Sequence, residues 1–322
     1  MAENATKRKN SISVVGYLKE NGLRQITDKE GGKVICGNLI IATDDISSYK
    51  VQSFYVKELD SKGNINDLFI TLQKFVNNEV VSIASFLKGN PGADFEQAKA
   101  AATQIWASGE YEEYAVKDGE EIVSTPTIRG RRVGFQADSM KEFIPHTKFA
   151  FTTYVESISE KDDKGNVIIS GLVEGYDKNS RSSYAMNRVN LLCEADCNGV
   201  AVADYVSKNY KVGQTLELQG YISTVQTKTV TEAVTDGFGT ANTPEQVITK
   251  ITHDYCVNGG KVAPGTLAWT KEQAKAGLIV RDSKALDNAD RKNNRKSYAA
   301  PVAEAPASAK VDVSAFGDDL DF

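Results

Sequence analysis

Tyrosine and basic side chains lie close together in one stretch of the second half of the chain, at Tyr176, Lys178, Arg181, Tyr184 and Arg188. Cations can follow the phosphates of an unpaired nucleic-acid strand while aromatic rings stack on its bases, at about 1–3 kcal/mol per stacked base. Tyrosine suits this role because its amphipathic ring tolerates an exposed position on a sheet. We predict that these residues bind single-stranded nucleic acid, although core or edge packing explains any single ring equally well.

The first half offers a comparable set of side chains. Tyr17 and Arg24 flank a loop, and Tyr49, Phe54 and Tyr55 fall on the strand expected at residues 49–58. Because successive side chains of a strand point to opposite faces, Tyr49 and Tyr55 should share a face that Phe54 opposes. We therefore predict that the two tyrosines contact nucleic acid and that Phe54 belongs to the core.

The stretch IRGRRVGF concentrates three arginines, Arg129, Arg131 and Arg132, around Gly130 and Gly134. Glycine lets a backbone approach a phosphate closely, and arginine binds phosphate through a planar fork of donors. We predict that the three arginines bind the strand. A turn with solvated arginines is the alternative interpretation.

Four residues have the types of a Cys₃His zinc site: Cys193, Cys197, His253 and Cys256. On a continuous strand, however, His253 and Cys256 would face opposite sides. Buried free thiols are the favoured interpretation, and we expect no cofactor.

Sequence motifs for catalysis are missing. The chain has two histidines, neither in an H-E-x-x-H setting, no G-x-x-x-x-G-K-[ST] phosphate loop and no G-x-S-x-G elbow. We expect a protein that is not an enzyme. A metal-dependent nuclease that uses scattered acids is a weak rival, because carboxylate triads have no fixed spacing.

Net charge is −5, whereas nucleic-acid-binding domains often carry a basic excess. The four aspartates of residues 311–322 account for all but one of these negative charges. A nearly neutral body can still carry a positive groove. The chain has neither a bilayer-spanning apolar run nor an export signal, so we expect no membrane contact, a cytoplasmic location and free cysteines.

The second half has the clearer pattern of elements. Strands are predicted at 149–158, 167–176, 187–193, 214–224 and 246–257, with a turn at 161–165 and a short helix at 199–209. Three strands, a helix and two strands are the order of the oligonucleotide-binding (OB) fold, a five-stranded barrel. Loop 225–245 should connect the last two strands.

The first half repeats this plan less cleanly. Strands are predicted at 11–18, 33–43, 49–58 and 80–87, and near 111–117 and 131–137, with helices at 66–78 and 94–107. The fold class expected is mainly β with α insertions: an OB-like domain at 11–148 after a flexible 1–10, and a second OB domain at 149–260. A different α+β domain is the alternative for the first half.

The C-terminal part changes character. Residues 261–310 should hold one short helix, at 270–279, followed by a charged mobile stretch and a proline-containing linker. The last twelve residues, 311–322, form an acidic tip with an aromatic end. We predict that it binds the basic, apolar pocket of another protein through six residues: Phe316, Asp318, Asp319, Leu320, Asp321 and Phe322. A disordered tail without a role is the alternative.

The strand order of residues 149–257 and the acidic tip ending in Phe322 resemble the single-stranded-DNA-binding proteins (SSBs) of bacteria and phages, although Asp321 stands where those proteins usually carry proline. The resemblance implies tandem OB barrels that coat single-stranded DNA in replication or recombination and recruit partner proteins through the tip. A phage origin, and so a bacterial host cytoplasm, is part of this expectation; self-association stays open. The alternative is a non-enzymatic interaction or virion-assembly protein whose barrels bind protein or sugar.

Overall fold

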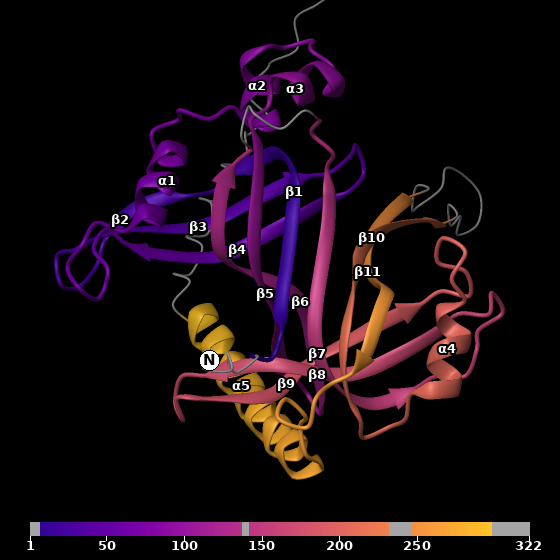
Figure 1. Cartoon of the computed structure of the whole chain (residues 1–322). Coiled ribbons are helices and arrows are strands. Elements are labelled where there is room, and N and C mark those ends of the chain that lie inside the picture. Colours follow the sequence, from indigo (N-terminus) through magenta and orange to yellow (C-terminus); the bar gives the residue numbers. More distant parts are fainter. Residues whose placement is uncertain (1–6, 137–141, 232–245, 298–322) are drawn as a thin grey trace, which may run out of the picture.

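The computed structural model describes residues 7–136, 142–231 and 246–297, and the chain is mainly β there (Figure 1). The strands of the first half are β1 (Asn10–Asn21), β2 (Arg24–Thr27), β3 (Lys33–Ala42), β4 (Ser48–Lys57), β5 (Gln104–Asp118) and β6 (Glu121–Phe135). Those of the second half are β7 (His146–Ile158), β8 (Val167–Asp177), β9 (Ser182–Cys193), β10 (Thr215–Thr231) and β11 (Gln246–Val262). The helices are α1 (Asp67–Val76), α2 (Ile83–Gly89), α3 (Phe95–Ala101), α4 (Val202–Asn209) and α5 (Lys271–Ser297).

The second half closes into a ring of five strands. The pairing runs β7–β8–β9–β11–β10 and returns from β10 to β7, with β9 and β11 parallel and the other neighbours antiparallel. Helix α4 lies between the third and fourth strands, where Val202, Ala203 and Val206 are buried. The predicted order of three strands, a helix and two strands is confirmed. The turn predicted at 161–165 also forms, because the Asp162 carboxylate accepts hydrogen bonds from the backbone N–H groups of Lys164 and Asn166.

The first half forms a second ring with the same pattern. Strand β1 pairs with β3, β3 with β4, β4 with β6 in parallel, β6 with β5, and β5 with β1. Helices α1, α2 and α3 occupy the position between the third and fourth strands of this ring, as α4 does in the other. The rings are joined because β1 also pairs with β7. One hydrophobic cluster runs through both, from Ile12 and Phe54 to Phe151 and Leu191.

Two predictions for the first half are wrong. Residues 80–87 do not form a strand; Ser82 caps helix α2 instead, through reciprocal contacts with Ser85. The helix predicted at 94–107 ends at Ala101, because residues from Gln104 pair with β1 as strand β5. Figure 1 places α2 and α3 at the end of the molecule away from α5.

Helix α5 is much longer than predicted, and the part of the stretch after 279 that the structure describes is helical. Ala274 and Leu278 pack with Trp269 against Tyr154 and Leu172 of the second ring. This packing supplies the stabilisation that the charged composition alone does not provide. None of the described helices combines the length and the apolar character of a membrane span.

Candidate functional site

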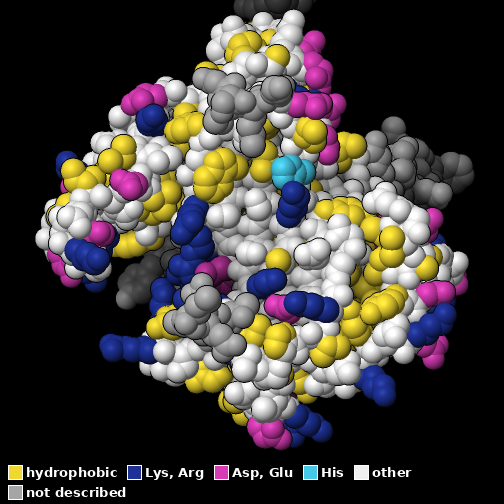
Figure 2. Space-filling model, in the orientation of Figure 1, with side chains coloured by type: hydrophobic (Ala, Val, Ile, Leu, Met, Phe, Trp, Pro, Cys, Tyr) yellow, Lys and Arg dark blue, Asp and Glu magenta, His cyan; other side chains and the backbone are white. Residues whose placement is uncertain are grey.

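A cleft of about 590 Å³ lies where the two rings meet α5. One side is built by β4, β5 and β6 of the first ring, another by the β8–β9 hairpin of the second ring, and the last by the inner side of α5. Figure 2 shows Lys and Arg side chains gathered where the upper and lower parts of the molecule meet, on the left of the view. The volume falls in the range of about 300–1,000 Å³ that is usual for ligand sites.

Three exposed tyrosines, one from each of three strands, line this cleft. Tyr55 of β4 is 58% exposed, Tyr114 of β5 is 50% exposed and Tyr176 of β8 is 48% exposed. A tyrosine ring combines a large apolar surface with a polar hydroxyl, and tyrosine is accordingly enriched at binding surfaces. Three half-exposed rings around one cleft therefore form a set of surfaces on which planar groups can stack.

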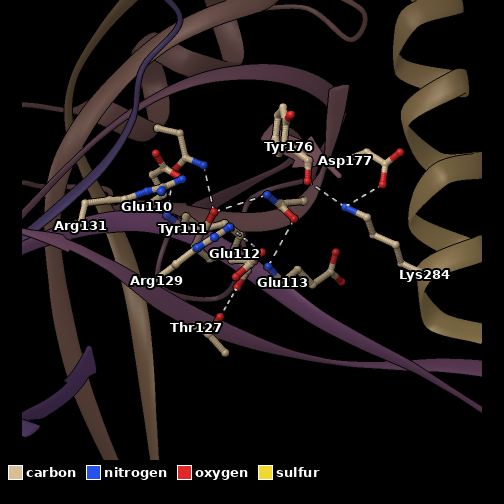
Figure 3. Close-up of polar contacts among 12 residues, drawn as sticks. Glu110, Tyr111, Glu112, Glu113, Thr127, Arg129, Arg131, Tyr176, Asp177 and Lys284 are labelled. Carbon is tan, nitrogen blue, oxygen red and sulfur yellow. Dashed lines mark hydrogen bonds and ion pairs between the residues drawn. The ribbon is translucent and has the colours of Figure 1, made fainter. Parts of the chain in front are cut away.

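The three arginines predicted from IRGRRVGF lie on β6, and two of them are paired with acids of β5. Arg131 Nη2 lies 2.6 Å from Glu110 Oε2, and Arg129 Nη1 lies 3.8 Å from Glu112 Oε1. Figure 3 shows both arginines beside these carboxylates, with Tyr176 nearby. Arg129 and Tyr176 line both the main cleft and a second hollow of about 220 Å³ that also includes Arg131. The two hollows therefore adjoin, and together we call them the trough.

Two cations of the main cleft are available for a ligand. Lys178, after β8, and Arg291, on α5, make no hydrogen bond or ion pair with any residue in the described part of the chain. They come from different walls. A polyanion in the cleft can therefore be held from both sides, whereas Arg129 and Arg131 must first exchange a carboxylate for a phosphate.

The floor of the cleft holds a buried ion pair between the first ring and α5. Glu113 accepts hydrogen bonds from Arg281 at 2.7 and 2.8 Å and from the backbone N–H of Arg188 at 2.9 Å. Burial favours the neutral acid, but the hydrogen bonds from Arg281 and Arg188 outweigh it and lower the pKa of Glu113 below its ordinary value. Glu113 is therefore charged at neutral pH and fixes β5, β9 and α5 to one another.

The cleft brings together four of the predicted site residues, Tyr55, Arg129, Tyr176 and Lys178, and Arg131 lies in the adjoining hollow. Five others lie outside the main cleft. Arg24 is exposed on β2, Arg132 is exposed on β6, Arg181 is exposed in the β8–β9 turn, Tyr184 is half-buried on β9, and Arg188 pairs with Glu156 at 3.4 Å. The residues of the tip, from Phe316 to Phe322, lie outside the described residues.

Two tyrosines of the first ring are occupied by packing. Tyr49 is 3% exposed, donates a hydrogen bond to the carbonyl of Ile222 at 3.0 Å and packs against His253. Tyr17 meets Phe143 edge to face and lies beside α2 and α3. Both tyrosine side chains thus hold parts of the fold together.

The prediction that Tyr49 and Tyr55 share a face is wrong, while the core position of Phe54 is confirmed. Ser53 has a φ of 61°, and the pairing of β3 with β4 shifts register beside it. A bulge inserts one residue and so reverses the alternation beyond it. Tyr49 and Phe54 consequently face the core, and Tyr55 faces the cleft.

The glycines of IRGRRVGF lie against aromatic rings of the fold. A Cβ on Gly130 would lie 2.4 Å from the Phe54 ring, and one on Gly134 would lie 2.7 Å from Trp106. The alternative interpretation of this stretch as a turn is also wrong, since residues 121–135 form β6.

The candidate zinc residues do not gather into a metal site. Cys193, Cys197 and Cys256 are buried free thiols, and burial raises the pKa of Cys193 and of Cys256 to about 12. His253 lies against Tyr49 and Thr224 instead. No group of three or more metal-binding side chains occurs within the described residues.

Tyr114, Arg281 and Lys284 are among the cleft residues that the sequence prediction did not include. Tyr114 stands among acids in GEYEEYAV, and the two α5 residues follow the end of the helix predicted there. The seven-residue spacing of Leu278 and Ala285 places both on one side of a longer helix, and this spacing could have indicated the helical position of Arg281 and Lys284. No comparable signal marks Tyr114.

Comparison with known proteins gives a family and a distant likeness. No curated protein matches the sequence. Two structures of the single-stranded DNA binding protein from Thermus aquaticus are similar: the wild type, with a TM-score of 0.39 and 10% identity, and a deletion mutant, with 0.38 and 9%. Each covers 80% of this chain, and the matches span 95% and 96% of those chains, respectively. Residues 9–290 match the YorF family model, and the chain belongs to the YorF family.

Proposed function

We propose that this protein binds single-stranded DNA without sequence preference, in the cleft between its two rings. The observation that carries the proposal is the set of three half-exposed tyrosines, Tyr55, Tyr114 and Tyr176, around a cleft with the cations Lys178 and Arg291 on different walls. Rings that stack on bases and cations that hold phosphates are the two components of sequence-independent strand binding.

The topology of the rings supports this proposal. We interpret both rings as OB barrels, because each has five strands with its helices between the third and the fourth. OB barrels bind oligonucleotides on the face of their second and third strands and with the loops beside it. In the first ring the third strand, β4, and the hairpin of the fourth and fifth strands, β5–β6, form one side of the cleft.

The charge balance of the trough makes stacking the larger part of the proposed interaction. Glu110 and Glu112 neutralise Arg131 and Arg129, so each phosphate contact there costs an ion pair. Unpaired bases expose the faces that tyrosines need, whereas a duplex hides them between neighbouring pairs. We therefore expect single strands to bind better than duplex.

The wider role belongs to the same proposal. The protein would coat strands during replication or recombination in the cytoplasm, would not be an enzyme, and would recruit partner proteins through its acidic tip. The residue types of the tip support this, because an acidic peptide with an aromatic end suits a basic, apolar pocket.

Binding of labelled oligo-dT, followed by fluorescence anisotropy, tests the function. Tyr55→Ala, Tyr114→Ala and Tyr176→Ala should each weaken binding about 5- to 150-fold, the equivalent of one stacked base. Tyr205→Ala is the matched control, because Tyr205 is 54% exposed on α4, outside the cleft. Absence of oligo-dT binding, preference for duplex, or an equal loss with Tyr205→Ala would refute the site, and Mg²⁺-dependent loss of the oligonucleotide would indicate a nuclease.

A further inference from the structure

We infer that α5 positions the stacking surface of the cleft, and that Lys284 acts on strand binding through Tyr176 and not through a phosphate. This inference rests on the proposed function. The sequence prediction did not include Lys284, because this residue lies beyond the helix predicted at 270–279.

Three polar side chains along one side of α5 contact two strands around the cleft, β5 and β8. Arg281 pairs with Glu113 of β5, Lys284 Nζ donates a hydrogen bond to the carbonyl of Tyr176 at 2.9 Å, and Asn288 donates one to the carbonyl of Ala115 at 2.9 Å. Residues spaced by three or four positions lie on the same side of a helix. The helix therefore connects the first ring to the hairpin of the second ring that carries Tyr176.

A close backbone contact sets the distance between α5 and β9. A Cβ on Gly277 would lie 2.1 Å from the carbonyl oxygen of Ala185, far inside contact distance. Ala274 and Ala285, on either side of this position, are buried. The helix is thus held close to β9 by a glycine, and its place along the hairpin is fixed by the polar contacts.

Lys284 also fixes the turn that follows Tyr176. Its Nζ lies 3.6 Å from one oxygen of Asp177, whose other oxygen accepts hydrogen bonds from the backbone and hydroxyl of Ser180 at 2.9 and 2.7 Å. Figure 3 shows Lys284 reaching from α5 to Tyr176 and Asp177. Because Lys284 contacts the backbone of Tyr176, the ring stays free to stack, and Lys178 lies within the same fixed turn.

A double-mutant cycle tests whether Lys284 acts through Tyr176, with oligo-dT affinity as the readout. Lys284→Met should weaken binding about tenfold in the full-length protein, but less than about twofold in a Tyr176→Ala background, because coupled residues give non-additive effects. The slope of log affinity against log salt should stay unchanged, since no phosphate contact is lost. Thermal unfolding midpoints of all variants establish that each is folded at the assay temperature.

Two further variants complete the test. Lys275→Met is the matched control on the same helix, since Lys275 is exposed and outside the cleft, and it should bind as the unmodified protein does. Gly277→Ala removes no charge but should push α5 away from β9, and it should weaken binding in the same way as Lys284→Met.

The possible failures are distinguishable. Equal losses from Lys284→Met in both backgrounds, with a salt slope reduced by about 0.7, would show that Lys284 contacts a phosphate directly and would overturn the inference alone. An unchanged oligo-dT affinity of Lys284→Met or of Gly277→Ala would also overturn the inference and leave the proposed function intact. Lack of oligo-dT binding by the unmodified protein would overturn the proposed function and the inference together.

Discussion

Replacing Arg281 with Met should strongly destabilise the protein, by an amount that depends on pH. The side chains of Arg281 and Glu113 are only 6% and 3% exposed, so the variant leaves a carboxylate in the interior without its two guanidinium hydrogen bonds. Breaking a buried pair by removing one partner costs about 3–5 kcal/mol. We expect a loss of this size in the free energy of unfolding at pH 7.

The pH dependence follows from the pKa of Glu113. In the unmodified protein this pKa is lowered, so the pair contributes fully above the unfolded value near 4.5 and is lost as pH falls through the folded pKa. In Arg281→Met burial dominates and should raise the pKa of Glu113, so that stability falls as pH rises through the raised value. The difference between the two proteins should therefore be largest at neutral pH and shrink toward pH 5.

Urea unfolding followed by the fluorescence of Trp106 and Trp269 between pH 5 and 8 measures this difference. A double variant, Glu113→Leu with Arg281→Met, removes both charges and should recover most of the lost stability, because an apolar replacement of a buried pair is often neutral. A loss below about 1 kcal/mol, or one that is the same at every pH, would mean that Glu113 reaches water after Arg281 is removed, and the reasoning would be refuted.

Three other changes should alter binding or stability in a direction that follows from the structure or from the composition of the tail. Glu112→Gln releases Arg129 from its carboxylate, so oligo-dT should bind a few-fold more tightly in anisotropy titrations and with a steeper salt dependence; weaker binding would contradict competition by Glu112. Gly130→Ala places a methyl against an aromatic ring and should lower stability to urea by about 1–3 kcal/mol, whereas Gly89→Ala, which meets nothing within 4 Å, should be close to neutral. Deleting residues 311–322 should preserve or tighten strand binding and abolish capture of partner proteins in pull-downs, and a weaker strand complex would argue against the proposed role of the tip.

The sequence predicted the second ring well because its strands carry their own signals. Residues 149–158 and 167–176 are rich in aromatic and β-branched side chains, and the turn between them is stabilised by Asp162 within the same segment. Such contacts are local, so periodicity and turn residues are sufficient to predict them. The parallel pairing of β9 with β11 is not local, and only the strand order suggested it.

The structure of the first ring and of the cleft depends on features that hydrophobic periodicity does not reveal, so the sequence predicted them less well. The bulge at Ser53 reverses which side chains face the core, so Tyr49 is buried and Tyr55 is exposed, although the two were expected to share a face. Glu113 and Arg281 are 168 positions apart and each appears in a charged, unremarkable stretch. A site built where two rings and a distant helix meet can be seen in the sequence only as separate residues.

The pairing of β1 with β7 has a consequence for anyone who divides this protein. Asn10 to Val15 cover the edge of β7 from His146 to Phe151, including the apolar Phe149 and Phe151. The second half expressed alone would present this edge of β7, and the first half the matching edge of β1, with unsatisfied amide and carbonyl groups. Such an edge is a template on which strands of other molecules add. Fragments cut between the rings should therefore self-assemble edge to edge, and studies of one ring in isolation require a substitute strand.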